Sequence, residues 1–224
     1  MSLNRQKGNM YEFITHTWNP IRGHCEYECS YCYMRKWGTA EPVRLHEKDL
    51  ADQLGTDRFI FVGSSTDMWA EGVATSDIAR VLAVCDDHPC NRYLFQSKNP
   101  QRFIDFIPRF PQHTVLGTTI ESNINWAISK APPQQHRADA MALVAGRGMR
   151  TMVTIEPILA FDLADLVALV ELCRPSWVNI GADSQGNDLL EPDKGKVRML
   201  ATVLREHGLE VIEKRNLARL DRKG

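Results

Sequence analysis

Short apolar runs alternate with amphipathic stretches along most of the chain, and the alternation becomes regular from residue 59 onward. Runs of β-branched and aromatic residues are typical of strands, whereas apolar residues at helical spacing are typical of helices. The strand candidates are Phe13–Thr15, Phe59–Val62, Tyr93–Phe95, Thr114–Thr118, Met152–Ile155, Trp177–Ile180 and Leu209–Ile212. Repeated βα units predict an α/β fold with a parallel sheet.

The helical stretches between these strands have recognisable beginnings and ends. One helix is expected behind the capping candidates Thr75 and Ser76, because apolar residues follow there at i, i+3, i+4 and i+7. A second helix is expected after Asp162 and stops before Pro175, and a third ends at Gly208. The sequence therefore predicts helices packed between successive strands.

The composition predicts one domain, residues 1–224. With 43% hydrophobic residues, the chain is long enough for one sizeable core and short for two. The net charge of -1 gives no overall positive field of the kind that draws proteins to nucleic acid. The start of the chain is polar, and no stretch approaches the roughly 20 apolar residues that span a bilayer. We therefore expect a cytoplasmic protein.

Polar clusters follow the predicted strands at the same relative position. In a barrel of parallel βα units, the loops at the carboxyl ends of the strands converge on one mouth, where active sites lie. The clusters are Gly63–Asp67, Gln96–Asn99, Thr119–Asn123, Glu156–Pro157 and Gly181–Ser184. These positions predict one site at that edge of the sheet.

The loop after the first predicted strand carries Cys25, Cys29 and Cys32, a C-x3-C-x2-C spacing with Tyr31 just before the last cysteine. Three thiolates on one loop can hold three irons of a [4Fe-4S] cube, which leaves the fourth iron without a protein ligand. An open iron can bind a substrate or a cofactor. The spacing therefore predicts a metal-binding iron–sulfur loop.

Two alternatives exist for these cysteines, a zinc site completed by His24 or His16 and three unrelated thiols. Zinc sites are usually built from two separated ligand pairs, and no second pair follows downstream. In a reducing compartment, cysteines are more often ligands or buried thiols than disulfides. The cluster is the favoured interpretation.

The cysteine loop and several other segments resemble the radical S-adenosylmethionine (SAM) superfamily. The resemblance is closest to the phage-associated three-Cys-motif radical SAM proteins and more distant to spore photoproduct lyase. Beside the cysteines, it rests on Trp18–Pro20, Cys32–Tyr33, Ser97–Pro100, Thr119–Asn123, Ile155–Pro157 and Val178–Gly181. His24 departs from the pattern, because relatives commonly place glycine directly before the first cysteine.

The resemblance implies a partial (β/α)6 TIM-type barrel with a possible extra C-terminal strand. It implies a [4Fe-4S] cluster and SAM as cofactors and a reductant such as flavodoxin or ferredoxin. In this superfamily the cluster's electron cleaves SAM to a 5′-deoxyadenosyl radical that abstracts a hydrogen atom from the substrate. By analogy, the substrate is a nucleotide or a base in nucleic acid, which the enzyme modifies or isomerises.

The resemblance also implies residues that bind SAM. Tyr31 would contact the adenine, the Gly63–Ser65 segment the amino group and Lys98 the methionine carboxylate. Thr119, Glu121 and Glu156 are further cofactor-binding candidates at strand ends, where carboxylates can bind ribose hydroxyls or amino groups. Taken residue by residue, an ordinary turn, a solvated lysine and salt bridges to Arg137 or Arg150 are the alternatives.

Candidates for the substrate cavity lie around the same mouth, and no catalytic residue is assigned. They are Trp18, Asn19, Asp67, Asp183 and Lys214. Packing beneath the loop is an alternative for Trp18, and capping of the next turn is one for Asp67. The basic segment 213–223 around Lys214 is expected to be mostly a solvated tail.

Two other functions stay open at this point. One is a non-catalytic zinc or iron–sulfur protein whose loop binds a partner. The other is a radical SAM enzyme that acts on a peptide. Absence of SAM turnover would indicate the first, and hydrogen abstraction from a peptide the second.

Overall fold

The computed structural model describes residues 3–6, 8, 10–38 and 41–222. Its main sheet has the order β1-β2-β5-β6-β7-β8-β9-β10, and it is open rather than closed into a full barrel. The strands are β1 (Leu3–Arg5), β2 (His16–Trp18), β5 (Phe59–Val62), β6 (Arg92–Ser97), β7 (Thr114–Thr119), β8 (Arg150–Ile155), β9 (Trp177–Ile180) and β10 (Glu210–Glu213). From β2 to β10 every neighbouring pair is parallel, which confirms the predicted partial barrel with an extra C-terminal strand.

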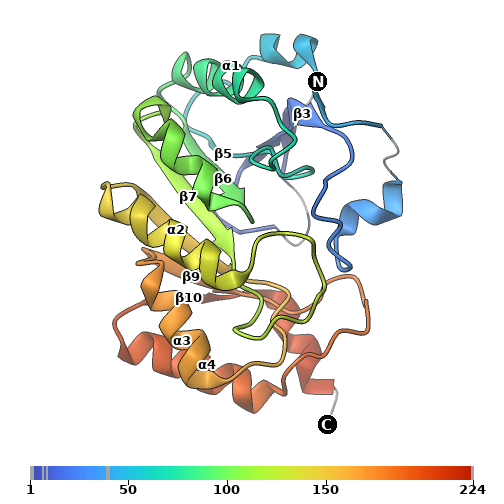
Figure 1. Ribbon diagram of the computed structural model, residues 1–224, viewed down its shortest axis with the longest axis vertical. Helices are drawn as coiled ribbons and strands as arrows, with labels where there is room; N and C mark the ends of the chain where they lie inside the picture. Colours follow the sequence, from blue (N-terminus) through green and yellow to red (C-terminus); the bar gives the residue numbers. More distant parts are fainter. Residues whose placement is uncertain (1–2, 7, 9, 39–40, 223–224) are drawn as a thin grey trace.

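Helices connect the parallel strands and cover one face of the sheet. The α-helices are α1 (Thr75–Asp86), α2 (Gln134–Gly146), α3 (Leu163–Leu172) and α4 (Lys194–Glu206). The 3₁₀ helices are η1 (Tyr33–Trp37), η2 (Glu47–Ala51), η3 (Pro100–Arg109) and η4 (Arg215–Arg222), and β3 (Ile21–Arg22) pairs antiparallel with β4 (Arg44–Leu45). Figure 1 shows α2, α3 and α4 following one another along one side of the sheet.

Side chains alternate between two apolar clusters on the two faces of the sheet. The larger cluster holds residues such as Ile60, Phe95 and Val153 beneath the helices. The smaller cluster holds Phe61 and Met152 on the inner face. Because successive strand residues point to opposite faces, each strand contributes to the core and to the interior of the barrel.

The segment before β2 closes the inner face instead of forming the strand predicted at Phe13–Thr15. The rings of Phe13 and Tyr11 stack with centroids 5.3 Å apart, and Phe13 also packs edge-on against Trp177 at 5.4 Å. The strand begins only at His16. The apolar run of this segment therefore reflects burial inside the barrel rather than strand pairing.

The helix ends differ from the prediction in detail. Thr75 is the first residue of α1, and Ala74 stands at the cap position without a side-chain hydrogen bond. Helix α4 has a true cap, since Asp193 accepts a hydrogen bond from the backbone N–H of Lys196. Across the described part of the chain, no helix combines the length and apolarity needed to cross a bilayer.

The C-terminal segment is packed, so the prediction of a mostly solvated tail was wrong. Lys214 directly follows β10, and η4 then buries Leu217 and Leu220 against the main core. A pair of leucines at i and i+3 on an otherwise basic segment provides enough apolar surface to dock it. This docking places Lys214 and Asn216 at the edge of the barrel interior.

Candidate functional site

A cavity of about 560 Å³ opens at the carboxyl ends of the parallel strands. Its size is typical of small-molecule and cofactor sites. Three groups of predicted site residues line it together. They are the cysteines Cys25, Cys29 and Cys32; the cofactor candidates Tyr31, Gly63, Ser64, Ser65, Lys98, Thr119 and Glu156; and the substrate candidates Asn19, Asp67, Asp183 and Lys214.

The three cysteines are free thiols on the wall of this cavity. Cys29 is buried, with its Sγ 3.3 Å from the hydroxyl oxygen of Ser129. Burial, with a smaller contribution from Asp67, raises the pKa of Cys25 to about 11. Cys25 is therefore protonated near neutral pH in the unliganded protein, and a metal would have to displace that proton.

The donor set is compatible with a four-iron cluster. Within residues 3–6, 8, 10–38 and 41–222, no three His, Cys, Asp or Glu side chains gather closely enough to hold one metal ion. In a [4Fe-4S] cube each thiolate binds a different iron, so the ligands need not converge on one point. Three thiols of one loop around one cavity match that requirement.

The segment between β7 and α2 holds the cysteine loop in place. The backbone N–H of Ser30 donates to the carbonyl of Ile128 at 2.8 Å, and that of Lys130 donates to Tyr27 at 2.8 Å. The Ser129 hydroxyl also donates to the carbonyl of Tyr27 at 3.2 Å. The loop is therefore fixed from both sides of Cys29 before any metal binds.

The Gly63–Ser65 turn, which follows β5, lies against the cysteine loop. Gly63 has a φ of +79°, which favours glycine, and a Cβ there would lie 3.1 Å from Cγ of Met68. Asn19 orients the turn, because its side-chain oxygen accepts from the backbone N–H of Ser65 at 2.9 Å and from the Ser64 hydroxyl at 3.2 Å. Asn19 therefore supports the turn as well as lining the cavity.

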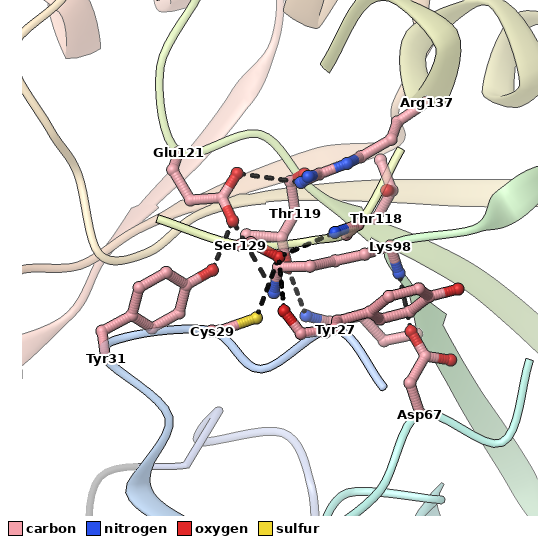
Figure 2. A network of polar contacts seen from close by, with 12 residues as sticks. Tyr27, Cys29, Tyr31, Asp67, Lys98, Thr118, Thr119, Glu121, Ser129 and Arg137 are labelled. Atoms are coloured by element: carbon pink, nitrogen blue, oxygen red, sulfur yellow. Dashed lines mark hydrogen bonds and ion pairs between the residues drawn. The ribbon is translucent and has the colours of Figure 1, made fainter. Parts of the chain in front are cut away.

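Glu121 is the centre of a buried network behind the cavity wall, and Figure 2 shows its partners converging on it. Its carboxylate accepts a hydrogen bond from the Tyr31 hydroxyl and pairs with Nη1 of Arg137 at 2.9 Å and Nζ of Lys98 at 3.7 Å. Glu121 is 1% exposed and is not among the residues that line the cavity. Of the two arginines named from the sequence as alternative partners, Arg137 is the one that pairs with Glu121.

Charges in this network compensate each other. Burial by itself would raise the pKa of Glu121, but Arg137 and Lys98 outweigh it and hold the pKa below its ordinary value. Burial would likewise lower the pKa of Lys98, but Cys29 and Glu121 hold it above its ordinary value. Glu121 and Lys98 are therefore both charged at neutral pH.

Asp67 links the Gly63–Ser65 turn to the end of β6. Its carboxylate accepts from the backbone N–H groups of Trp69 at 3.0 Å and Lys98 at 2.9 Å and from the Ser97 hydroxyl at 2.9 Å. Burial raises its pKa, although these hydrogen bonds oppose that shift. Asp67 thus caps the turn before Trp69, which was the alternative role expected from the sequence. It also lines the cavity.

Glu156 faces the cavity from the end of β8. Its Oε2 is 2.7 Å from Nζ of Lys214, and its Oε1 accepts from the side-chain amide of Asn216 at 3.1 Å. The Lys214 ammonium also lies 5.0 Å from the centre of the Tyr11 ring. These groups form a charged patch on the wall made by β8 and β10.

Asp183 organises the loop after β9. Its carboxylate accepts from the backbone N–H of Gln185 at 3.0 Å and from the Asn187 side-chain amide at 2.8 Å. Its own N–H donates to Glu191, which is paired with Arg219. The loop is folded so that Ser184 and Gln185 line the cavity.

Trp18 was expected at the cavity mouth, and the structure places it in the core with no exposed surface. It lies on the helix-covered face of β2, whereas its neighbour Thr17 lines the cavity. Strand alternation fixes this division, because adjacent side chains point to opposite faces. Packing, the alternative named for Trp18, is therefore its role.

Several residues of the cavity and of the network behind it were not named as site residues from the sequence. Gln96 belongs to a predicted polar cluster but was not named as a site residue, and Thr154 was not predicted at the site at all. The alternation of Thr154 with Val153 and Ile155 in β8 was a signal for the interior face. Arg137 occupies the buried face of α2 among Ala138 and Met141, a placement that pointed to a buried partner. No sequence pattern pointed to Tyr11, because it lies before β2 and is brought to the cavity only by the way that segment folds back onto the barrel interior.

Solved structures similar to this chain share its fold at low sequence identity. One mutant of spore photoproduct lyase matches with a TM-score of 0.65 and 12% identity over 92% of this chain and 78% of the other. A second mutant of that lyase, with bound AdoMet and dinucleoside spore photoproduct, matches at 0.59 and 14% identity, over 88% and 63%. SuiB of Streptococcus suis bound to S-adenosylmethionine matches at 0.61 and 10% identity, over 88% and 49%.

These matches confirm the predicted fold likeness to spore photoproduct lyase, while the likeness to phage-associated three-Cys-motif proteins stays a prediction. No curated protein sequence matches the chain. A family model matches residues 9–195, from the segment before β2 to the start of α4. The matched region contains the cysteine loop and the strands from β2 to β9. The chain therefore belongs to the family described as protein of unknown function (DUF5131).

Proposed function

We propose that this chain is a radical SAM enzyme whose [4Fe-4S] cluster is held by Cys25, Cys29 and Cys32. The observation that carries the proposal is their common position, three free thiols on one loop that line one cavity at the carboxyl ends of parallel strands. Similarity in fold to structures with bound SAM supports it. One continuous sheet from β1 to β10 also supports a single domain.

SAM would lie between the cysteine loop and the adjoining strand ends. The Gly63–Ser65 turn offers backbone groups at close approach, because its glycine has no side chain to keep a ligand away. Lys98 is charged and lines the cavity, so it can pair with a carboxylate. Tyr31 lines the same wall, and Thr119 adds a hydroxyl from the end of β7. Glu121 is not part of this set, because its side chain is 1% exposed and does not line the cavity.

When bound, the cluster would supply the electron that cleaves SAM to a carbon radical able to take a hydrogen atom from the substrate. The protein's own contribution is positioning and exclusion of water. Tyr31, held by Glu121, keeps the loop closed on its inner side. The packed segment around Tyr11 shuts the far end of the barrel interior.

The proposed substrate is a nucleotide or a base in nucleic acid. A solved neighbour carries a dinucleoside photoproduct, whereas SuiB in another structure carries a precursor peptide. The chain's net charge of -1 is poorly suited to tight, sequence-independent binding of DNA. Electrons would come from a small reductant protein such as flavodoxin or ferredoxin.

SAM turnover tests the enzyme class directly. The purified chain is reconstituted anaerobically with iron and sulfide, reduced with dithionite and incubated with SAM. We expect 5′-deoxyadenosine in the wild type and in Cys90→Ala, a matched control at an exposed cysteine outside the cavity. Cys29→Ala should show neither cluster absorption nor product. An intact four-iron spectrum in Cys29→Ala would contradict the ligand assignment.

A further inference from the structure

A second polar centre lies in the cavity apart from the cysteine loop and the Glu121 network. It consists of Glu156, Lys214 and Asn216, contributed by β8 and by the residues that follow β10. The side chains of Lys214 and Glu156 are 9% and 17% exposed, so the pair is largely shielded from water. Both residues line the cavity.

This centre places a hydrogen-bond donor beside an acceptor. Nζ of Lys214 and Oε2 of Glu156 are 2.7 Å apart. An ammonium group has three donors, and an ionised carboxylate has about four lone-pair positions. Glu156 and Lys214 can therefore each contact a ligand in addition to their contact with one another and the contact of Glu156 with Asn216. The complementary ligand carries an acceptor next to an N–H group on a single edge.

The Watson–Crick edge of a nucleobase has that arrangement. Uracil, for example, places its N3–H beside a carbonyl oxygen on the same side of the ring, because the ring holds the amide in the cis form. A peptide bond is almost always trans, so its N–H and C=O point in opposite directions and cannot both reach one such pair. The geometry therefore favours a base over a peptide backbone.

Two aromatic rings border the cavity beside the charged pair, although Phe13 already stacks on the ring of Tyr11. Tyr11 and Phe61 both line the cavity, with ring centroids 6.3 Å apart. The Tyr11 hydroxyl donates to Oε1 of Gln96 at 2.8 Å, and Nε2 of Gln96 donates to Thr119 at 3.1 Å. This chain of hydrogen bonds fixes the position of the Tyr11 ring beside Lys214.

The geometry points to a base-binding subsite in which Glu156 and Lys214 read the Watson–Crick edge of a nucleobase. This inference deepens the proposed function and rests on it, since it names the recognised part of the substrate. The edge is used in duplex pairing, so the base must be unpaired when it enters the cavity. The substrate is accordingly a free nucleoside or nucleotide, or a base in a single-stranded or extruded position.

Binding of uridine and 3-methyluridine to the cluster-reconstituted chain, measured by calorimetry with SAM present, tests this assignment. The two probes differ only at N3, where a methyl group replaces the hydrogen that would be donated to Glu156. We expect 3-methyluridine to bind at least about tenfold more weakly than uridine. Glu156→Gln and Lys214→Met should each weaken uridine binding. Each should also reduce the ratio of the affinities for uridine and 3-methyluridine.

Glu213→Gln is the matched control, because Glu213 is the neighbour of Lys214 and pairs with Arg205 on an exposed surface. It should leave both affinities unchanged. The subsite would be overturned if the wild type bound the two probes equally. It would also be overturned if both Glu156→Gln and Lys214→Met still preferred uridine over 3-methyluridine as strongly as the wild type does. Thermal unfolding of each variant shows whether a lost affinity reflects lost structure.

Failure of the subsite and failure of the enzyme class give different results. Formation of 5′-deoxyadenosine from SAM alone needs no nucleobase, so it reports on the cysteine loop independently. If SAM is cleaved while neither probe binds, the base-binding subsite is wrong and the enzyme class stands. If uridine is discriminated while SAM is not cleaved, the subsite stands and the enzyme class is wrong.

Discussion

Glu121 and Glu156 follow the ends of the neighbouring strands β7 and β8, and in the sequence they look like equivalent candidates. In the structure their surroundings differ. Glu121 is 1% exposed and is enclosed by Arg137, Tyr31 and Lys98, whereas the side chain of Glu156 is 17% exposed and faces the cavity beside Lys214. A carboxylate at a strand end can therefore belong to the scaffold or to the site, and its partners and its exposure decide which.

The largest effect should come from opening the Glu121 network. Arg137→Met removes a guanidinium that donates to Glu121 and to the backbone carbonyls of Thr119 and Pro132. Breaking a buried ion pair from one side costs about 3–5 kcal/mol, because the remaining charge is left buried. We expect a loss of that size in the free energy of unfolding, measured by chemical denaturation. A loss below about 1 kcal/mol would show that the network is not structural.

A smaller loss of stability is expected on the cavity side. Lys214→Met leaves Glu156 with its hydrogen bond from Asn216 and with partial access to the cavity. We expect about 1–3 kcal/mol in the same denaturation experiment, a cost typical of one poorly satisfied polar group. If Lys214→Met is as destabilising as Arg137→Met, then the assignment of Glu121 to the scaffold and of Glu156 to the site is wrong.

Acid should weaken the Glu121 network in a predictable direction. Arg137 and Lys98 hold the pKa of Glu121 below its ordinary value of 4.5, so its charge contributes stability above that value and the contribution is lost as pH falls through the folded-state pKa. The stability difference between wild type and Glu121→Gln should therefore be largest near neutral pH and shrink as the pH falls below the ordinary value of 4.5. Denaturation curves at several pH values measure it, and a constant difference would contradict this assignment of charge.

Tyr31 connects Glu121 to the cysteine loop. Removing its hydroxyl should mainly affect how tightly the loop retains iron. Tyr31→Phe removes the hydroxyl that donates to Glu121 while it keeps the ring. We expect faster loss of iron from the reconstituted chain to a chelator, followed by absorbance, together with a stability loss of about 1–2 kcal/mol.

Tyr33→Phe makes the same chemical change on the same loop, at a side chain that is 41% exposed. Its hydroxyl donates to the backbone carbonyl of Ser64 at 3.0 Å. The effect on iron release should be smaller than in Tyr31→Phe. The reverse order would indicate that Glu121 does not hold the loop.

The smallest effect is expected at an exposed pair. Arg205 and Glu213 are 2.8 Å apart, with side chains 48% and 39% exposed. Surface pairs contribute about 0–1 kcal/mol, because water screens both charges. Arg205→Met should therefore change the free energy of unfolding by less than about 1 kcal/mol. A larger change would mean that pairing alone, without burial, explains the other variants.

Local pattern predicted most of the sheet and the cysteine loop. Phe59–Val62 and Trp177–Ile180 are strands with the predicted bounds, because both are short apolar runs buried on both faces. Helix α2 was not predicted, since its buried face mixes Gln134 and Arg137 with small apolar residues and its periodicity is weak. The segment around Phe13 resembled a strand because its apolar residues fill the barrel interior.

Contacts between residues that are far apart in the sequence could not be predicted from the sequence pattern. Glu121 and Arg137 are close in sequence, and their pairing was named as one of several alternatives. Glu156 meets Lys214 and Asn216 only because β10 and η4 return to the sheet beside β9. Tyr11 enters the cavity from the other end of the chain. Pairings of this kind depend on the assembled topology, which no local pattern encodes.

Electron paramagnetic resonance of the reduced, reconstituted chain, recorded before and after addition of SAM, tests the central claim most directly. Three protein thiolates leave one iron of the cube open, so we expect the signal of a reduced four-iron cluster to change when SAM binds. Cys90→Ala should behave as the wild type, because Cys90 is exposed and outside the cavity. A spectrum unaffected by SAM, or a tetrahedral zinc ion bound to the three cysteines, would contradict the account.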